Sequence, residues 1–153
     1  MNKELIELEI NKANINEKEA LIDLLKEGNL YRWLPENETF ENFYTVKNKN
    51  ELIACFAVDC KNETGILKSV AVKKNMRGKG IGKKIVDLLP NVCKKLNMKK
   101  LFAASSESPA FWRKTSFKEI KFENINDPYL LEYIEFTKKK VPGIVSNYFL
   151  LDI

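Results

Sequence analysis

Residues Ser69–Val86 read SVAVKKNMRGKGIGKKIV, and this stretch organises the interpretation of the whole chain. Val70–Val72 are apolar and rich in β-branched residues, which is typical of a buried strand. Arg77–Gly82 then places three glycines among basic residues. Glycine permits positive φ and close approach of a ligand, and the N-terminus of the amphipathic helix that follows favours anions. We predict a phosphate-binding turn between a strand and a helix; the alternative is an ordinary connection.

The spacing of these glycines excludes two common phosphate-binding motifs. A nucleoside triphosphate loop ends in Gly-Lys followed by Ser or Thr, and the sequence has no such tripeptide. A dinucleotide-binding turn has the spacing G-x-G-x-x-G, whereas the glycines here follow G-x-G-x-G. The pattern that fits is R-x-x-G-x-G, which begins at Arg77, five residues after Val72.

Length and composition favour one globular domain over residues 1–153. Hydrophobic residues make up 44% and charged residues 31%, and no apolar run reaches membrane-spanning length. The first residues lack a charged-then-apolar leader pattern, so we expect a cytoplasmic protein without a membrane partner. The three cysteines are odd in number and not in C-x-x-C spacing, which favours a reducing compartment over a disulfide framework.

The chain has no histidine, and this excludes a histidine base, a Ser-His pair and a histidine-ligated metal. We expect no metal. The net charge of +5 is compatible with nucleic-acid binding, but the basic residues are spread along the chain. A polyanionic cofactor accounts more economically for the cluster around Arg77, so we expect no nucleic-acid partner.

Hydrophobic periodicity predicts the order of the elements. The predicted strands are Leu5–Ile10, Phe43–Lys47, Glu51–Asp59, Ile66–Val72, Lys100–Ala104, Phe117–Phe122 and Ser146–Asp152. The predicted helices are Glu17–Glu27, a short one within Leu30–Pro35, then Lys79–Leu96, Ala110–Thr115 and one from Asp127 to Lys138.

Local signals set several helix ends. Asn16 is the expected N-cap of the first helix and Gly28 its stop. Ala20 is expected on the apolar face of this helix. Pro90 lies inside the helix after the glycines, so we expect a kink there, or an end near Leu89 followed by a restart.

A second motif follows the glycine turn by one helix and one strand. Residues Pro109–Phe117 read PAFWRKTSF, after a serine-rich loop in which Ser108 is the expected N-cap. The alternative is a short amphipathic helix with core aromatics. The segment resembles A-x-x-F-Y-x-K-x-G-F, and the two motifs together resemble the GCN5-related N-acetyltransferases (the GNAT superfamily) over Ile66–Phe117. The resemblance implies an α/β fold with a mixed, mostly antiparallel sheet flanked by helices.

The resemblance also implies acetyl-CoA as the co-substrate, with an amine attacking the thioester directly. Its pantetheine arm would pair with the main chain of Val70, Ala71 and Val72. The pyrophosphate would bind backbone N–H groups and cations of the glycine turn and the start of the helix. These residues are Arg77, Gly78, Lys79, Gly80, Ile81, Gly82 and Lys83, and the second motif would add Phe111 and Lys114.

Two positions depart from the family pattern. The tyrosine that often protonates the leaving thiolate is replaced by Trp112, whose indole can donate a hydrogen bond but cannot release its proton. Trp112 remains a candidate for stacking on the cofactor or orienting the sulfur. Ser116 stands where the family has glycine, which is unfavourable if this residue needs a positive φ.

Candidate acid–base residues lie outside the two motifs. The strand before the glycine turn has none of the glutamates that many relatives use, which leaves Asp59 and Glu107 as candidate bases or ordinary surface carboxylates. Lys68 is a candidate contact for a substrate carboxylate or a solvent-facing lysine, and Ser105 is a second candidate substrate contact.

Three functions stay open at this point. The leading prediction is an N-acetyltransferase that acts on a small amine, with an amine that carries a carboxylate as one option. The second is a CoA-binding regulatory or sensor domain with weak catalysis, and the third is a protein-modifying acetyltransferase of the same fold. A homodimer is left open.

Overall fold

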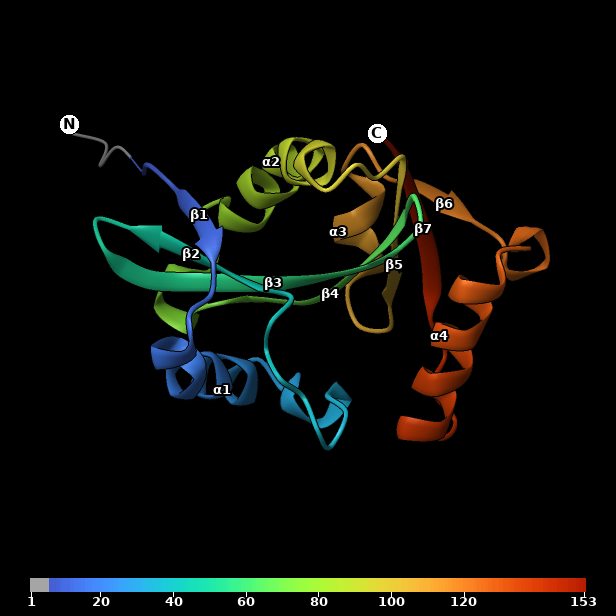
Figure 1. Ribbon diagram of the computed structural model, residues 1–153, viewed down its shortest axis with the longest axis horizontal. Helices are drawn as coiled ribbons and strands as arrows, with labels where there is room; N and C mark the ends of the chain where they lie inside the picture. The colour runs from blue at the N-terminus through green and yellow to red at the C-terminus, as the bar shows by residue number, and fades with distance from the viewer. Residues whose placement is uncertain (1–5) are drawn as a thin grey trace. The chain divides into compact units, whose positions relative to one another are not determined.

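The computed structural model describes residues 6–153, so Leu5 at the start of the first predicted strand lies outside the described residues. Its strands form a sheet in the order β1-β2-β3-β4-β5-β7-β6. β4 and β5 pair parallel, while β1–β2, β2–β3, β5–β7 and β6–β7 pair antiparallel (Figure 1). The predicted fold class, a mostly antiparallel mixed sheet flanked by helices, is confirmed.

Most predicted elements form within a few residues of their expected bounds. The strands are β1 Glu9–Lys12, β2 Phe43–Asn48, β3 Glu51–Lys61, β4 Thr64–Val72, β5 Lys100–Ser105, β6 Lys118–Ile120 and β7 Asn147–Asp152. The helices are α1 Lys18–Glu27, α2 Ile81–Lys95, α3 Pro109–Arg113 and α4 Pro128–Lys140. Short 3-10 turns occupy Ile15–Glu17, Tyr31–Trp33, Lys74–Met76 and Phe122–Asn124.

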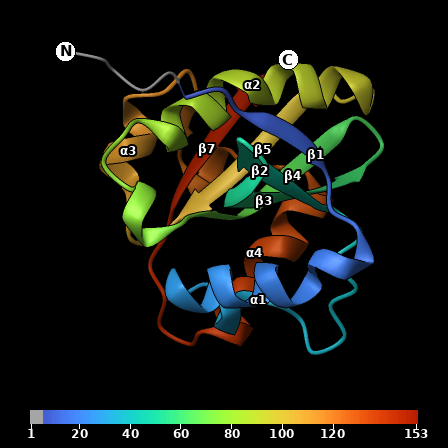
Figure 2. The same ribbon diagram turned by 90° about the vertical axis from the view of Figure 1, so that its left-hand side faces the viewer.

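The chain divides into two compact units, and the prediction of a single domain stays a prediction. The first unit comprises the residues up to Ala57 together with Ser69–Ile81. In it, α1 lies on one side of β2, as Figures 1 and 2 show. Leu21, Leu24 and Leu25 of α1 are buried in a core that also contains Phe43, Cys55 and Ala71. Ala20 is exposed, so its predicted place on the apolar face is wrong.

The N-terminus of α1 differs from the prediction. Asn14, and not Asn16, caps the segment: the Asn14 side chain accepts from the Asn16 backbone N–H, and Glu17 accepts from the Asn14 N–H at 3.0 Å. This reciprocal pair is a capping box, and it starts a 3-10 turn that leads into the helix. Gly28 ends α1 as predicted.

The second unit comprises Val58–Lys68 and Gly82–Ile153. Two of its helices, α2 and α4, lie on opposite faces of β5 and β7 (Figures 1 and 2). On the α4 face, Ile66 and Phe102 form a core with apolar residues of α4 and the turn before it. The face toward α2 is also closely packed, since a Cβ on Gly65 would overlap Met98.

Helix α2 runs through Pro90 from Ile81 to Lys95, so the option of an end near Leu89 with a restart is wrong, while the kink stays a prediction. A proline inside a helix removes one hydrogen bond. Here the flanking residues Ile85, Leu89 and Cys93 are fully buried, and this packing holds the helix together across the proline.

Among residues 6–153, no helix combines the length and the apolar character that crossing a bilayer requires. The three cysteines are unbonded; Cys55 and Cys93 are buried and Cys60 is exposed. Burial raises the pKa of Cys55 to about 12 and that of Cys93 to about 11, so both buried thiols stay neutral.

Candidate functional site

The glycine turn of the first unit has the backbone expected of an anion site. Gly78 and Gly80 adopt φ values of 77° and 78°, which other residues adopt only with strain. A Cβ built on either residue would meet no atom within 4 Å. The turn is therefore glycine-rich because of its conformation, and its exposed backbone is open to a ligand.

Side chains and backbone groups of the same unit hold this turn in place. The Arg77 Nε donates to the Val72 carbonyl at 2.9 Å, which ties the turn to the end of β4. The Lys73 N–H donates to the Ile53 carbonyl at 2.7 Å, and the Lys74 N–H donates to the Glu27 carboxylate. Arg77, expected to add charge to the turn, thus also has a structural contact.

Strand β4 has an irregular backbone at Ser69. Its parallel register with β5 runs from Thr64 opposite Lys100 to Leu67 opposite Ala103. Ser69 has a φ of 56°, a left-handed conformation that is unusual within a strand, and the Cys55 thiol donates to its carbonyl at 3.6 Å. Val70–Val72, the predicted pantetheine contacts, follow this residue.

In the second unit, α3 packs closely against the first turn of α2. A Cβ on Gly82 would lie 3.3 Å from the Phe111 ring, so the glycine makes room for this ring. Lys83 in the first turn of α2 and Lys114 after α3 are both exposed. The helix N-terminus and these cations can together hold a phosphate group.

Trp112 lies on the buried side of α3, with 7% of its surface exposed. Its ring is in contact with those of Phe111, Phe117 and Phe149 at centroid distances of 5.2, 5.1 and 6.2 Å. This aromatic cluster anchors the helix. Ser116, where the family has glycine, does not adopt a positive φ.

Polar contacts fix α3 further. Arg113 donates to both carboxylate oxygens of Glu119, at 2.7 and 3.1 Å, and Asn147 donates to Glu119 at 3.0 Å. Before the helix, the buried Ser105 hydroxyl accepts from the Ser108 N–H at 3.1 Å. Ser108 occupies the N-cap position, but its side chain does not make the expected cap bond.

The structure brings together Asp59 and Lys68, which the sequence suggested for separate roles. Their side chains form an ion pair and are 29% and 27% exposed. The Lys68 ammonium also lies 5.2 Å from the centroid of the Tyr133 ring. Glu107, the other candidate base, is exposed in the loop before α3.

Sequence reasoning missed Tyr129 and Tyr133, which lie four residues apart on α4 near Asp59. Burial raises the pKa of Tyr129 to about 12 and raises the pKa of Tyr133 further. The negative charge of Asp59 is the second cause in both cases. The spacing of four residues was the available signal, but it equally fits an ordinary core-facing helix.

The charge of the chain is unevenly divided. Basic and acidic residues are equal in number in the first unit, so the whole net charge of +5 belongs to the second unit. This unit includes most of helix α2 with its first-turn lysines, and its excess positive charge favours anionic ligands.

Solved structures of similar fold come from several bacteria. N-acetylglutamate synthase of Neisseria gonorrhoeae, with coenzyme A and L-arginine, aligns with a TM-score of 0.75 and 13% identity over 95% of this chain and 33% of that one. The present chain thus spans about a third of that relative's length. Rv2747 of Mycobacterium tuberculosis, in complex with CoA, gives a TM-score of 0.70, 22% identity and coverages of 95% and 99%.

A GNAT acetyltransferase of Elizabethkingia anophelis, with acetyl-CoA bound, aligns with a TM-score of 0.64 and 17% identity over 95% of this chain and 98% of that one. At these identities the likeness shows the fold. A family model described as an acetyltransferase (GNAT) domain matches residues 39–119, which is more than half of the sequence and includes both motifs. The chain therefore belongs to the GNAT acetyltransferase family.

Proposed function

We propose that this protein transfers the acetyl group of acetyl-CoA to the amino group of a small molecule that also carries a carboxylate. The observation that carries the proposal is the half-buried ion pair of Lys68 and Asp59. An amino acid is a zwitterion, and such a pair offers a cation for its carboxylate and an anion for its ammonium group. Support also comes from the structural relative N-acetylglutamate synthase.

The glycine turn and the start of α2 fit the cofactor of the family. The open, positive-φ backbone at Gly78 and Gly80 would bind the pyrophosphate through N–H groups, with Lys79 and Lys83 adding charge. Main-chain groups of Val70–Val72 would orient the pantetheine arm, with Phe111 and Lys114 as further contacts. When bound, acetyl-CoA supplies an activated thioester.

Asp59 would receive the proton that the acceptor must lose. An amine with a pKa of about 10 is mostly protonated at neutral pH and is not nucleophilic in that form. When Lys68 binds the carboxylate of the acceptor, its ion pair with Asp59 would open. Asp59 would then lie beside the ammonium group of the acceptor and could accept its proton. Glu107 is the alternative base, and Ser105 a further candidate contact in the loop that leads to it.

Trp112 is placed in this proposal as a support for α3. Its ring packs among three others, and an indole N–H does not transfer a proton at neutral pH. The absence of the family's acid at this position is also the observation that favours the second candidate, a CoA-binding sensor domain with weak catalysis.

Release of the CoA thiol separates the two candidates. The protein is mixed with acetyl-CoA and a panel of amines with and without a carboxylate, and free thiol is followed over time. The proposal expects release with amines that carry a carboxylate, and a product heavier by one acetyl group. Binding of acetyl-CoA without thiol release by any amine would instead support the sensor domain.

A further inference from the structure

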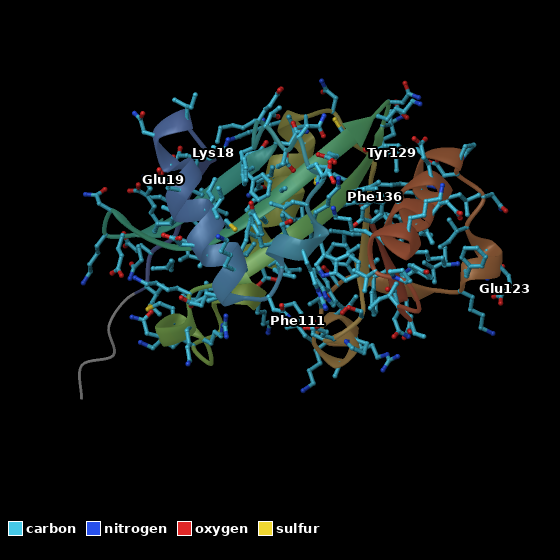
Figure 3. All side chains as sticks on the ribbon, turned by 90° about the horizontal axis from the view of Figure 1, so that it is seen from below. Lys18, Glu19, Phe111, Glu123, Tyr129 and Phe136 are labelled. Carbon is cyan, nitrogen blue, oxygen red and sulfur yellow. The ribbon has the colours of Figure 1, made fainter. Side chains whose placement is uncertain are left out.

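Helix α4 has two neighbouring stripes of different character. Leu130, Ile134 and Thr137 are buried. Tyr129, Tyr133 and Phe136 follow one another at intervals of four and three residues, which places them on a single flank of the helix. All three are partly exposed, and Figure 3 shows Tyr129 and Phe136 on the same flank.

This aromatic flank is ordered by contacts within the second unit. The Tyr133 ring stacks on Phe136 at 6.5 Å and 23°, and meets Phe102 edge-on at 6.5 Å and 87°. Phe102 in turn stacks on Tyr148 at 5.8 Å. Tyr133 and Phe136 are therefore held in place by ring contacts that continue through Phe102 to Tyr148.

The aromatic flank adjoins the ion pair. The Lys68 ammonium lies over the Tyr133 ring, and the carboxylate of Asp59 is close enough to both tyrosines to affect their titration. A molecule whose charged ends contact Lys68 and Asp59 would therefore have its side chain beside these rings.

We infer that Tyr129, Tyr133 and Phe136 select the side chain of the acceptor, and that the acceptor is an α-amino acid with an aromatic side chain. The inference rests on the proposed function and specifies its substrate class. Covering partly exposed rings removes apolar surface from water, and ring–ring contacts add to that gain. A polar side chain would lose its hydration against these rings without gaining a hydrogen-bond partner from Phe136.

Acetylation of matched amino acids tests the inference. L-phenylalanine, L-leucine, L-alanine and L-glutamate are compared as acceptors by kcat/KM under the same conditions. We expect phenylalanine to exceed alanine by about tenfold or more, the scale on which apolar pockets discriminate. The ratio for these two acceptors should fall toward unity in Phe136→Ala, through a rise in KM for phenylalanine.

If Phe136→Ala is unstable, Phe136→Leu replaces it, because leucine keeps the apolar volume. This variant should lose the preference for phenylalanine over leucine. Phe122→Ala is the matched control. Phe122 is an exposed aromatic residue of this unit, 45% exposed; it is not on the flank, and its ring contact is with Tyr148 and not with Tyr133 or Phe136. Its removal should leave the ratio as in the native protein.

The outcomes separate the inference from the function on which it rests. A preference for glutamate or alanine, or an unchanged ratio in both Phe136 variants, overturns the aromatic assignment and leaves the acetyltransferase standing. Failure of every amino acid and every other amine to release thiol overturns the proposed function, and the inference with it.

Discussion

The glycine turn at Arg77–Gly82 and the ion pair of Lys68 and Asp59 offer two kinds of chemistry. The turn presents backbone N–H groups, and at Gly78 and Gly80 no side chain is present and none would meet a neighbour. The ion pair presents charged side chains that already contact each other and an aromatic ring. One region is open before a ligand arrives, and the other must exchange a partner to bind one.

This difference would separate cofactor binding, which is general to the family, from acceptor binding, which is specific to one protein. In the proposed function, backbone groups of the turn would bind the phosphates of the cofactor, and backbone groups are insensitive to most side-chain changes. Side chains contributed by β3, β4 and α4 can change one at a time, and in the proposed function each change would alter which acceptor binds. Variants should therefore affect the two regions independently, and the following experiments test that separation.

The largest effect is expected for Gly80→Glu. The substitution adds a negative charge where phosphate would bind, and forces a non-glycine residue to a φ of 78° at a cost of about 1–2 kcal/mol. Acetyl-CoA should no longer raise the melting temperature. Gly143→Glu is the matched control, since Gly143 has a φ of 81° and equally open surroundings. Binding that survived Gly80→Glu would rule out the turn as the phosphate site.

Lys68→Gln should affect only the acceptor. It removes the cation for the carboxylate and leaves Asp59 without this partner, so kcat/KM for an amino acid should fall by about thirtyfold, or about 2 kcal/mol. The Kd of acetyl-CoA should not change. Lys73→Gln, which breaks the 3.0 Å ion pair with Glu51, is the control. Equal losses in both variants would argue against a role of Lys68 in acceptor binding.

Gly82→Ala is expected to have a smaller effect on cofactor binding than Gly80→Glu. Alanine is favoured over glycine in a helix by up to about 1 kcal/mol, but its Cβ would lie 3.3 Å from the Phe111 ring. The ring must shift, so we expect weaker acetyl-CoA binding by calorimetry without a loss of thermal stability. Tighter binding, or unfolding of the variant, would contradict the assigned contact between Gly82 and Phe111.

The smallest effect is expected for Glu119→Gln. The hydrogen bond from Arg113 holds the pKa of Glu119 below its usual range, and both side chains are exposed. The ion pair therefore stabilises the protein above the unfolded pKa of Glu119 and is lost as the pH falls through the lower folded value. A small difference in melting temperature from the native protein should be present at pH 7 and disappear in acid. Glu123→Gln, at another exposed glutamate, should show no such pattern.

The glycine turn could be predicted because its determinants are local. Positive φ, a helix start and flanking cations all occur within a few residues, and R-x-x-G-x-G at Arg77 encodes them together. The end of α1 at Gly28 was readable for the same reason. The start of α1 could not be predicted, because Asn14 and Asn16 are both good caps. The geometry of the 3-10 turn before the helix decides between them.

The proposed acceptor region could be predicted only in part, because its residues meet through tertiary structure. The sequence suggests Asp59 and Lys68 for separate roles, and their pairing depends on how β3 and β4 are aligned. Tyr133 joins them only because α4 packs on this face, which no local pattern specifies. Pro90 shows the same limit of local rules, since burial of its neighbours outweighs its helix-breaking character.

The exposed thiol of Cys60 makes the native sequence convenient for spectroscopy. Cys55 and Cys93 are buried, and their high pKa values leave almost none of the reactive anion near pH 8. A maleimide dye would therefore attach at Cys60 alone, one residue from Asp59 along β3. Its emission could report the arrival of an acceptor in real time, without any cysteine having to be removed.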